Sequence, residues 1–360
     1  MALTHQLSIL LLFFGAAKVG VCQAYQPVDS LMTKFLNKEK VAGVSISVNK
    51  AGEILYSKGF GYADVKQKIK IQPNHQIRTA SVAKVITATA LGKLVSEGKL
   101  DFDTPIGNYI PYLKAPYTQL TARQIAGHTA GIRHRPSSNR IKKKHYTEVR
   151  EMVTFFMDDP LNFKPNTAYQ YSTLGYNLLA SLIEEISGKK YVDYMKEDIF
   201  LPLNMTQTFP DDKYNFTQKD AKLYYLKKNG KLKLDKRIVD GSYKLAGAGF
   251  RSTSIDLSKM MDAYSNGFLS EKVVEEMFRS NLFVNGKPTN VGIAWRLNKD
   301  SNNRLTIEHA GNWQGARTVI VYYPESQLTV SIMINTRCNI SIEETAKQVA
   351  QFFLEGSSKS

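Results

Sequence analysis

The sequence predicts an α+β fold in which one antiparallel β-sheet, built from both ends of the chain, is flanked by helices and carries an inserted, mostly helical lobe. Residues 41–64 and 291–336 alternate as strands do, whereas residues 81–200 have mostly helical periodicity. Strands, then helices, then strands pack most simply in this way. With 360 residues, of which 43% are hydrophobic, the chain can bury a large core.

The sheet lobe is expected to comprise about residues 30–65 and 288–356. Apolar residues alternate on both sides of an "NKAGE" turn, which predicts a β-hairpin over 41–64. Four further strands and a closing helix are expected at 291–298, 304–311, 316–324, 327–336 and 341–354.

The helical lobe is expected to span about residues 70–287. Its clearest helices end near Gly or Pro and lie at 81–98, 121–127, 145–159 and 173–188. Residues 203–244 form a basic, loop-rich region, and Thr253 with Asp256 has the pattern of a capping box for another helix. We therefore predict a single domain over residues 25–360.

The first 24 residues are predicted to be a signal peptide. The apolar stretch from Leu7 to Ala17 is too short to cross a bilayer but suits a signal-peptide core, with cleavage after Ala24. Cys22 raises a lipoprotein alternative, which the bulky Val21 disfavours. Export to the periplasm or the extracellular space is thus expected, and the remaining Cys338 is interpreted as a packing residue.

The formal net charge of +16 indicates attraction to anionic surfaces. Lysines concentrate in 139–146 and 218–237, with no helix-turn-helix, zinc-finger or ribonucleoprotein pattern, so no nucleic-acid partner is predicted. Association with an anionic membrane or cell-wall surface stays open. No H-E-x-x-H pair is present, and "AGAGF" lacks dinucleotide spacing, so neither a metal nor a cofactor is implied.

The spacing Ser-x-x-Lys occurs four times, at Ser47/Lys50, Ser81/Lys84, Ser96/Lys99 and Ser187/Lys190. The first pair lies in a strand, where residues three apart face opposite sides, and the last two lie at helix ends beside glycines. Only Ser81 begins a helix, on which Lys84 shares its face with apolar residues. Burial there would lower the pKa of Lys84 and make it a base; the alternative is a capping Ser81 with a solvated Lys84.

Two later segments favour the interpretation of Lys84 as a base. In "YQYSTLGYNLL", Tyr171 precedes a helix start, so that its phenol could project into the same cleft. In "TIEHAGNWQGA", His309 ends a strand, and Gly311 would let a ligand approach the backbone closely. Taken alone, each of these residues is more often structural.

The order of these motifs along the chain, with Ser81 and Lys84 first, Tyr171 next and His309 last, resembles that of the serine β-lactamase and penicillin-recognising enzymes. The resemblance covers roughly residues 30 to 350. The resemblance is closest to class C β-lactamases, to the related esterases and D-aminopeptidases, and to the animal mitochondrial β-lactamase-like proteins. It implies that Ser81 is the acyl-forming nucleophile, that Lys84 is its proton acceptor, and that Tyr171 acts with Lys84 as base and then as acid to the leaving group. It also implies an oxyanion hole made by the backbone N–H groups of Ser81 and Asn312.

Two residues expected to bind substrate depart from the family pattern. Thr173 stands where many members have Asn, and His309, before Gly311, stands where β-lactamases usually have Lys. The sequence therefore predicts an exported serine hydrolase that cleaves an ester, an amide or a small peptide bond. A true β-lactamase or D-alanyl-D-alanine carboxypeptidase is the alternative enzyme, and a non-catalytic binding or assembly module is the alternative of another class.

Overall fold

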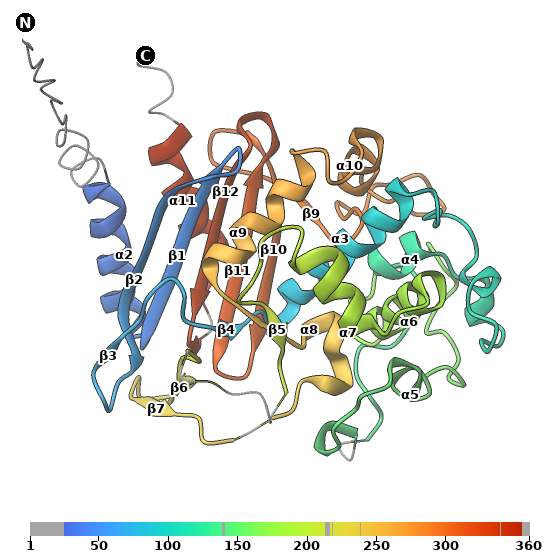
Figure 1. The fold of residues 1–360 in the computed structure, drawn as a ribbon, viewed down its shortest axis with the longest axis horizontal. Coiled ribbons are helices and arrows are strands. Elements are labelled where there is room, and N and C mark those ends of the chain that lie inside the picture. The colour runs from blue at the N-terminus through green and yellow to red at the C-terminus, as the bar shows by residue number, and fades with distance from the viewer. Residues whose placement is uncertain are drawn as a thin grey trace, which may run out of the picture.

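The computed structural model describes residues 25–138, 141–212, 217, 219–237, 239–338 and 340–354. The predicted signal peptide, including Cys22, lies outside these residues. At the centre is a seven-stranded antiparallel sheet in the order β3-β2-β1-β12-β11-β10-β9 (Figure 1). Its strands are β1 Gly43–Lys50, β2 Glu53–Asp64, β3 Ile69–Lys70, β9 Arg296–Lys299, β10 Leu305–Trp313, β11 Ala316–Tyr323 and β12 Leu328–Ile334.

The two ends of the chain meet inside this sheet, as predicted. β1 pairs with β12 so that Val44 lies opposite Ile334. Apolar side chains on one face pack against two helices, α2 (Gln26–Glu39) and α11 (Glu343–Leu354). The other face packs against α9 (Ser254–Met260), where the Ser254 hydroxyl lies 2.7 Å from that of Ser45, and against the helical lobe. The antiparallel sheet and the α+β class are therefore confirmed.

The helical lobe surrounds α3 (Ala83–Ser96), which is buried along nearly its whole length. Its other helices are α4 Ala122–Ala126, α5 Val149–Val153, α6 Gly175–Ser187, α7 Tyr191–Tyr194, α8 Leu245–Ala248 and α10 Glu271–Phe278. Two small sheets join the lobes: one comprises β4 Ile77–Arg78, β8 Phe250–Ser252 and β5 Phe209–Pro210, and the other β13 Thr336–Arg337, β6 Tyr224–Leu226 and β7 Leu232–Leu234.

Two predicted elements are shorter than expected. The helix expected over 145–159 is limited to α5. Just beyond its end, Arg133 donates to the carbonyl of Phe155 and Tyr117 to that of Phe156, in place of further helical turns. The strand expected over 291–298 begins only at β9. Ala294 before it has a φ of 70°, which extended strands do not adopt.

The region 203–244 contains β5, β6 and β7 rather than loops alone. The Thr253 side chain caps α9, as predicted. In the other half of a capping box, the Asp256 carboxylate would accept from the backbone of Thr253. Here the carboxylate accepts instead from the backbone N–H of Gln207 and the hydroxyl of Thr208.

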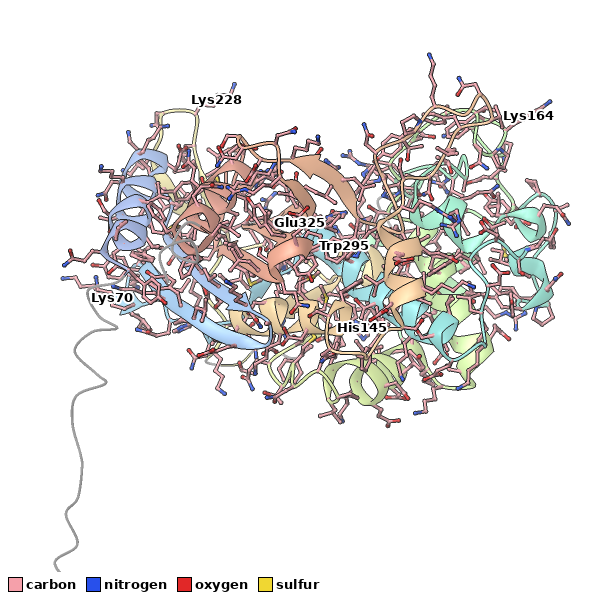
Figure 2. All side chains as sticks on the ribbon, turned by 90° about the horizontal axis from the view of Figure 1, so that it is seen from above. Lys70, His145, Lys164, Lys228, Trp295 and Glu325 are labelled. Carbon is pink, nitrogen blue, oxygen red and sulfur yellow. The ribbon has the colours of Figure 1, made fainter. Side chains whose placement is uncertain are left out.

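Lysines are distributed widely over the surface. In Figure 2, Lys70, Lys164 and Lys228 project outward from separate parts of the molecule, whereas Trp295 lies in the interior. None of the helices in the described part of the chain combines the length and the apolar character needed to cross a bilayer.

Candidate active site

Ser81 lies in a short 3-10 turn, Ala80–Val82, that leads directly into α3. It is half-buried and lines a cleft. The preceding residue, Ala80, has a φ of 47°, a left-handed conformation that is costly for a residue with a side chain and is often found at functional sites. The turn packs against β10, which holds the backbone of Ser81 in place.

Lys84 lies one turn into α3, and its side chain is fully buried. Its Nζ donates to the carbonyl oxygen of Gly247 at 2.7 Å and to the hydroxyl of Thr173 at 3.3 Å. Burial, together with the positive charges of Lys244 and Arg296, holds the pKa of Lys84 well below its ordinary value. A neutral amine has two N–H donors and one lone pair. With both donors used, the lone pair is left to accept a proton.

Tyr171 and Thr173 lie in the loop before α6, and two histidines hold this loop. The ring Nδ1 of His128 accepts from the backbone N–H of Ser172, and that of His134 accepts from the N–H of Thr173, both at 3.2 Å. Both rings are therefore assigned as Nε2–H tautomers. Burial lowers the pKa of His134 to about 4, so the ring is neutral near pH 7.

The Tyr171 phenol is brought to Ser81. Both side chains line the cleft, and burial raises the pKa of the phenol above its ordinary value, with the neighbouring Ser81 side chain acting in the opposite direction. The Lys84 Nζ lies 4.7 Å from the centre of the Tyr171 ring. The ring of His128 packs 4.4 Å away, which fixes the phenol's orientation. The structure thus brings Ser81, Lys84, Tyr171 and Thr173 together.

Of the predicted site residues on β10, Asn312 lies in the cleft and His309 lies in the interior. Asn312 is exposed and lines the cleft. His309 is buried, its Nδ1 lies 3.0 Å from the carbonyl oxygen of Ala310, and it is not among the described lining residues. Burial and the charge of Lys84 hold the pKa of His309 well below its ordinary value. His309 thus lies behind the cleft wall.

Gly311 is needed for a different reason from the one expected. A Cβ atom at this position would lie 2.5 Å from the carbonyl oxygen of Thr79 and 2.8 Å from the backbone nitrogen of Ser81. Real Cβ atoms essentially never come so close. The missing side chain therefore makes room for the chain's own Ser81 turn, rather than directly for a ligand.

The cleft in front of Ser81 has a volume of about 680 Å³. Its wall includes His134, Lys244, Arg296 and Trp313, none of which was predicted as a site residue. The segment "GHTAGIRH", residues 127–134, contains His134 but no local pattern that links it to Ser81. Lys244 and Arg296 lie in segments that the sequence did not connect with Ser81.

The other Ser-x-x-Lys pairs have structural partners. The Ser47 hydroxyl lies 2.8 Å from that of Ser254, between the sheet and α9. The Ser96 hydroxyl accepts from the backbone N–H of Ser270, and that of Ser187 from the N–H of Lys189. These contacts confirm that the spacing alone carries no chemistry here.

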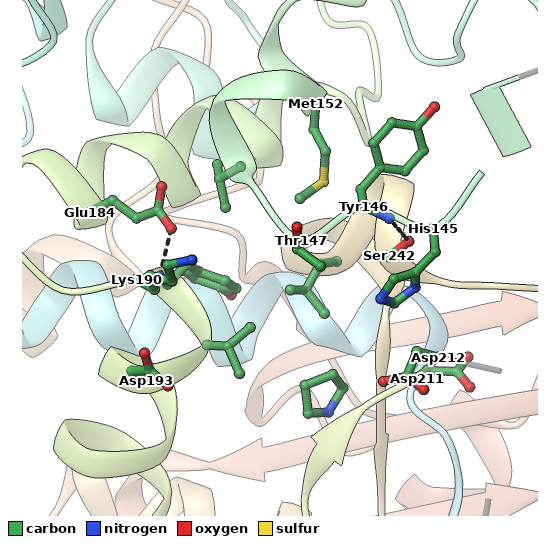
Figure 3. Close-up of a pocket in the computed structure, with 15 residues that line it drawn as sticks. His145, Tyr146, Thr147, Met152, Glu184, Lys190, Asp193, Asp211, Asp212 and Ser242 are labelled. Atoms are coloured by element: carbon green, nitrogen blue, oxygen red, sulfur yellow. Dashed lines mark hydrogen bonds between the residues drawn. The ribbon is translucent and has the colours of Figure 1, made fainter. Parts of the chain in front are cut away.

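A second, smaller pocket of about 280 Å³ lies elsewhere in the helical lobe (Figure 3). Its serine, Ser242, accepts from the backbone N–H of Tyr146 through its hydroxyl, and its own backbone N–H donates to Asp240 at 2.8 Å. Its Glu184 accepts from the backbone N–H of Tyr191, and its His145 lies 2.8 Å from Asp240. These groups have structural partners, so we place the candidate chemistry in the larger cleft.

Comparison with known proteins agrees with this geometry. The beta-lactamase family model matches residues 28–351. The mitochondrial serine beta-lactamase-like protein LACTB of Mus musculus is 28% identical over 69% of this chain and 58% of its own, and penicillin-binding protein 4* of Bacillus subtilis is 26% identical over 85% and 70%. The chain thus spans less than two thirds of the mitochondrial relative's length.

Solved structures show the same fold. The octameric penicillin-binding protein homologue from Pyrococcus abyssi has a TM-score of 0.77 at 25% identity, covering 92% of this chain and 77% of that one. D-amino acid amidase from Ochrobactrum anthropi has a TM-score of 0.78 at 24% identity, covering 94% and 99%. From the family match and the fold together, this chain belongs to the beta-lactamase family of serine hydrolases.

Proposed function

We propose that this protein cleaves an ester, an amide or a small peptide bond through an acyl-enzyme on Ser81. The observation that carries the proposal is that Ser81 and Tyr171 line one cleft beside the fully buried Lys84, whose Nζ lies 4.7 Å from the centre of the Tyr171 ring. Burial keeps the Lys84 amine poised to accept a proton, since it disfavours the ammonium form.

In the proposed reaction, the Ser81 hydroxyl gives up its proton to Lys84, with Tyr171 assisting, as its oxygen attacks the substrate carbonyl carbon. The backbone N–H groups of Ser81 and Asn312 would bind the negative charge that develops on the carbonyl oxygen. Tyr171 then protonates the leaving group and is itself reprotonated by the Lys84 ammonium, so that both groups return to their starting forms. A water molecule gives up its proton to the neutral Lys84 as its oxygen attacks the acyl carbon. The bond to the Ser81 oxygen then breaks, the acid is released, and that proton passes from Lys84 to the Ser81 oxygen.

The test is covalent labelling followed by intact-mass measurement. The protein is treated with a fluorophosphonate, with penicillin, and with a panel of activated esters and D-amino-acid amides, the last suggested by the amidase relative. We expect one fluorophosphonate adduct, on the peptide that contains Ser81, and none in Ser81→Ala. The proposal fails if the parent protein gives neither adduct nor turnover. Rapid penicillin or cephalosporin turnover would instead favour the β-lactamase alternative.

Gly311→Ala offers a test of the proposed oxyanion hole. The added methyl group would press on Thr79 and on the Ser81 nitrogen, so we expect the acylation rate to fall by about a hundredfold, as for the loss of one oxyanion donor. Overpacking is expected to cost about 1–3 kcal/mol of unfolding free energy. Gly52→Ala is a useful control for stability, because a Cβ there meets nothing within 4 Å, although its φ of 88° adds local strain. A normal acylation rate in Gly311→Ala would contradict this placement of the oxyanion hole.

Export also belongs to the proposal. It is supported by the leader-like pattern of residues 1–24, and the net charge of +16 would favour contact with an anionic membrane or cell-wall polymer. N-terminal sequencing of the mature protein from each cell fraction tests it. A chain that retains residue 1 and stays inside the cell would contradict export.

A further inference from the structure

The cleft in front of Ser81 is strongly basic. Six lysine and arginine residues line it: Arg135, Lys142, Arg237, Lys244, Arg296 and Arg337. None of the described lining residues is Asp or Glu. A cleft lined by one sign of charge attracts and orients molecules of the opposite sign. Two of these cations, Arg296 and Lys244, lie at different positions relative to Ser81, so they would bind anionic groups at two distinct places.

The positions of two of these cations can be compared with that of Ser81 along strand β10. Arg296 on β9 pairs with Glu308 on β10. The backbone nitrogen of Ser81 packs against Gly311, three residues further along, or about 10 Å at the rise of a strand. Trp313 lies two residues beyond Gly311, or about 7 Å further along the strand. The Lys244 ammonium lies 3.5 Å from the centre of the Trp313 indole ring. Ser81 therefore lies between the level of Arg296 and that of Lys244.

Arg296 marks the first of these levels. It is exposed and lines the same cleft as Ser81 and Tyr171, so it faces the catalytic centre. Glu308, its register partner, is occupied with Lys347, whose Nζ lies 3.1 Å from the carboxylate. Within the described residues no carboxylate lies within 4.0 Å of Arg296, which leaves its guanidinium to a ligand.

Lys244 marks the second level. Its ammonium is close enough to Arg78, Lys142 and Arg135 for all three to act on it, and only Asp211 opposes them. The Asp211 carboxylate is itself 2.7 Å from the guanidinium of Arg78. The cluster therefore has excess positive charge, and an anion in the cleft would offset it.

We propose that the substrate carries a negatively charged group on each side of the scissile carbonyl, one bound by Arg296 and the other by Lys244 over Trp313. A carboxylate or a phosphate ester would satisfy either position, since both present oxygens to a cation. This inference rests on the proposed hydrolase function and adds the substrate class to it.

The test uses four matched aryl esters: neutral, charged only on the acyl side, charged only on the leaving-group side, and charged on both. Each rate is corrected by the ester's own hydroxide-catalysed rate. We expect each charge to raise kcat/KM by about ten- to a hundredfold, as for a hydrogen bond to a charged group. The gain should shrink as salt is added. Exchanging each carboxylate for a phosphate identifies the preferred anion.

Variants assign each charge to its cation. Arg296→Gln and Lys244→Gln should each remove the gain from a different one of the two charges. Because each variant also removes a positive charge that lowers the pKa of Lys84, the gain is measured as the ratio of charged-ester to neutral-ester rates within that variant. Lys34→Gln, on the exposed side of α2, is the matched control and should change nothing. The proposal is overturned if Ser81-dependent turnover is equal for all four esters, or if either variant slows all four equally. Absence of any Ser81-dependent turnover would instead contradict the proposed function.

A pH profile separates the two cations. Burial, with Arg78, Lys142 and Arg135 nearby and Asp211 opposing them, lowers the pKa of Lys244 to about 7. The ammonium form predominates below that pH, so the gain at the Lys244 side should decline as pH rises through about 7, whereas the gain at Arg296 should persist. Lys244→Arg should make both gains independent of pH. A pH-independent preference in the parent protein would contradict the role of Lys244.

Discussion

Lys84→Met is expected to slow acylation of Ser81 by about 10²- to 10⁴-fold while leaving the folded protein nearly as stable as before. The rate should fall because methionine cannot accept the Ser81 proton. Stability should change by less than about 2 kcal/mol, since two effects oppose each other. A thioether relieves the cost of burying an amine, whereas the carbonyl of Gly247 and the hydroxyl of Thr173 lose a donor.

The measurement combines stopped-flow acylation with urea unfolding. Lys93→Met is the matched control on the same helix, because its ammonium pairs at the surface with Glu97 at 2.6 Å and lies away from the cleft. That variant should acylate normally. If the Lys84→Met variant also acylates normally, Lys84 is not the base. If that variant no longer unfolds cooperatively, the role of Lys84 is structural.

The same lysine should leave a signature in the pH dependence of stability. Its pKa is lower in the folded chain than in the unfolded chain, so the unfolded state binds more protons between those two values. The unfolding free energy contributed by this group therefore rises with pH until the unfolded pKa of about 10.4 is passed. Lys84→Met should remove this slope, which a pH series of urea unfolding curves would detect.

Asp211→Asn is expected to produce the largest loss of stability of the variants considered, about 3–5 kcal/mol, as for breaking a buried ion pair. Arg78 and Arg251 lie directly opposite each other on β4 and β8, and both are 2% exposed. The Asp211 carboxylate lies 2.7 Å from Arg78 and 3.7 Å from Arg251, so it bridges the two guanidinium groups, and Arg251 is also paired with Asp220.

Activity should fall with stability in this variant. Arg78 donates to the carbonyl of Val239 at 2.8 Å and packs 4.3 Å from the centre of the Trp313 ring, so it supports the cleft wall. Asp158→Asn, in a surface pair with Lys114 at 3.3 Å, should cost less than about 1 kcal/mol. Urea unfolding of both variants is the measurement, and a loss below about 1 kcal/mol for Asp211→Asn would show that the pair is dispensable.

The sequence could predict the sheet because its strands carry a strong period-2 pattern. It could also predict that Lys84 is buried on the helix that follows Ser81, because a lysine on the face of an otherwise apolar helix is unusual. The helix α2 was missed although Val28, Met32 and Phe35 share one face. The segment after α5 accepts hydrogen bonds from Arg133 and Tyr117, which are distant in sequence, and no local pattern contains such contacts.

The cleft wall could not be predicted for a related reason. Lys244 lies in a basic, loop-rich segment where a lysine usually means a solvated surface, and only the tertiary fold places it over Trp313. Arg296 begins a strand that was expected to start earlier. His309 shows the reverse case: the sequence placed it in the site, and the fold buries it behind the wall.

The pairing of β1 with β12 has a consequence for how the chain is made. The ladder that joins Val44 to Ile334 cannot form until nearly the whole chain has been synthesised, which takes roughly 15–60 s after β1 emerges at 5–20 residues per second. During that time one long edge of the β1–β2 hairpin lacks its partner, and unpaired apolar edges invite aggregation. A nascent chain of this protein should therefore depend on a holding chaperone, and a ribosome stalled before β12 should carry an aggregation-prone product.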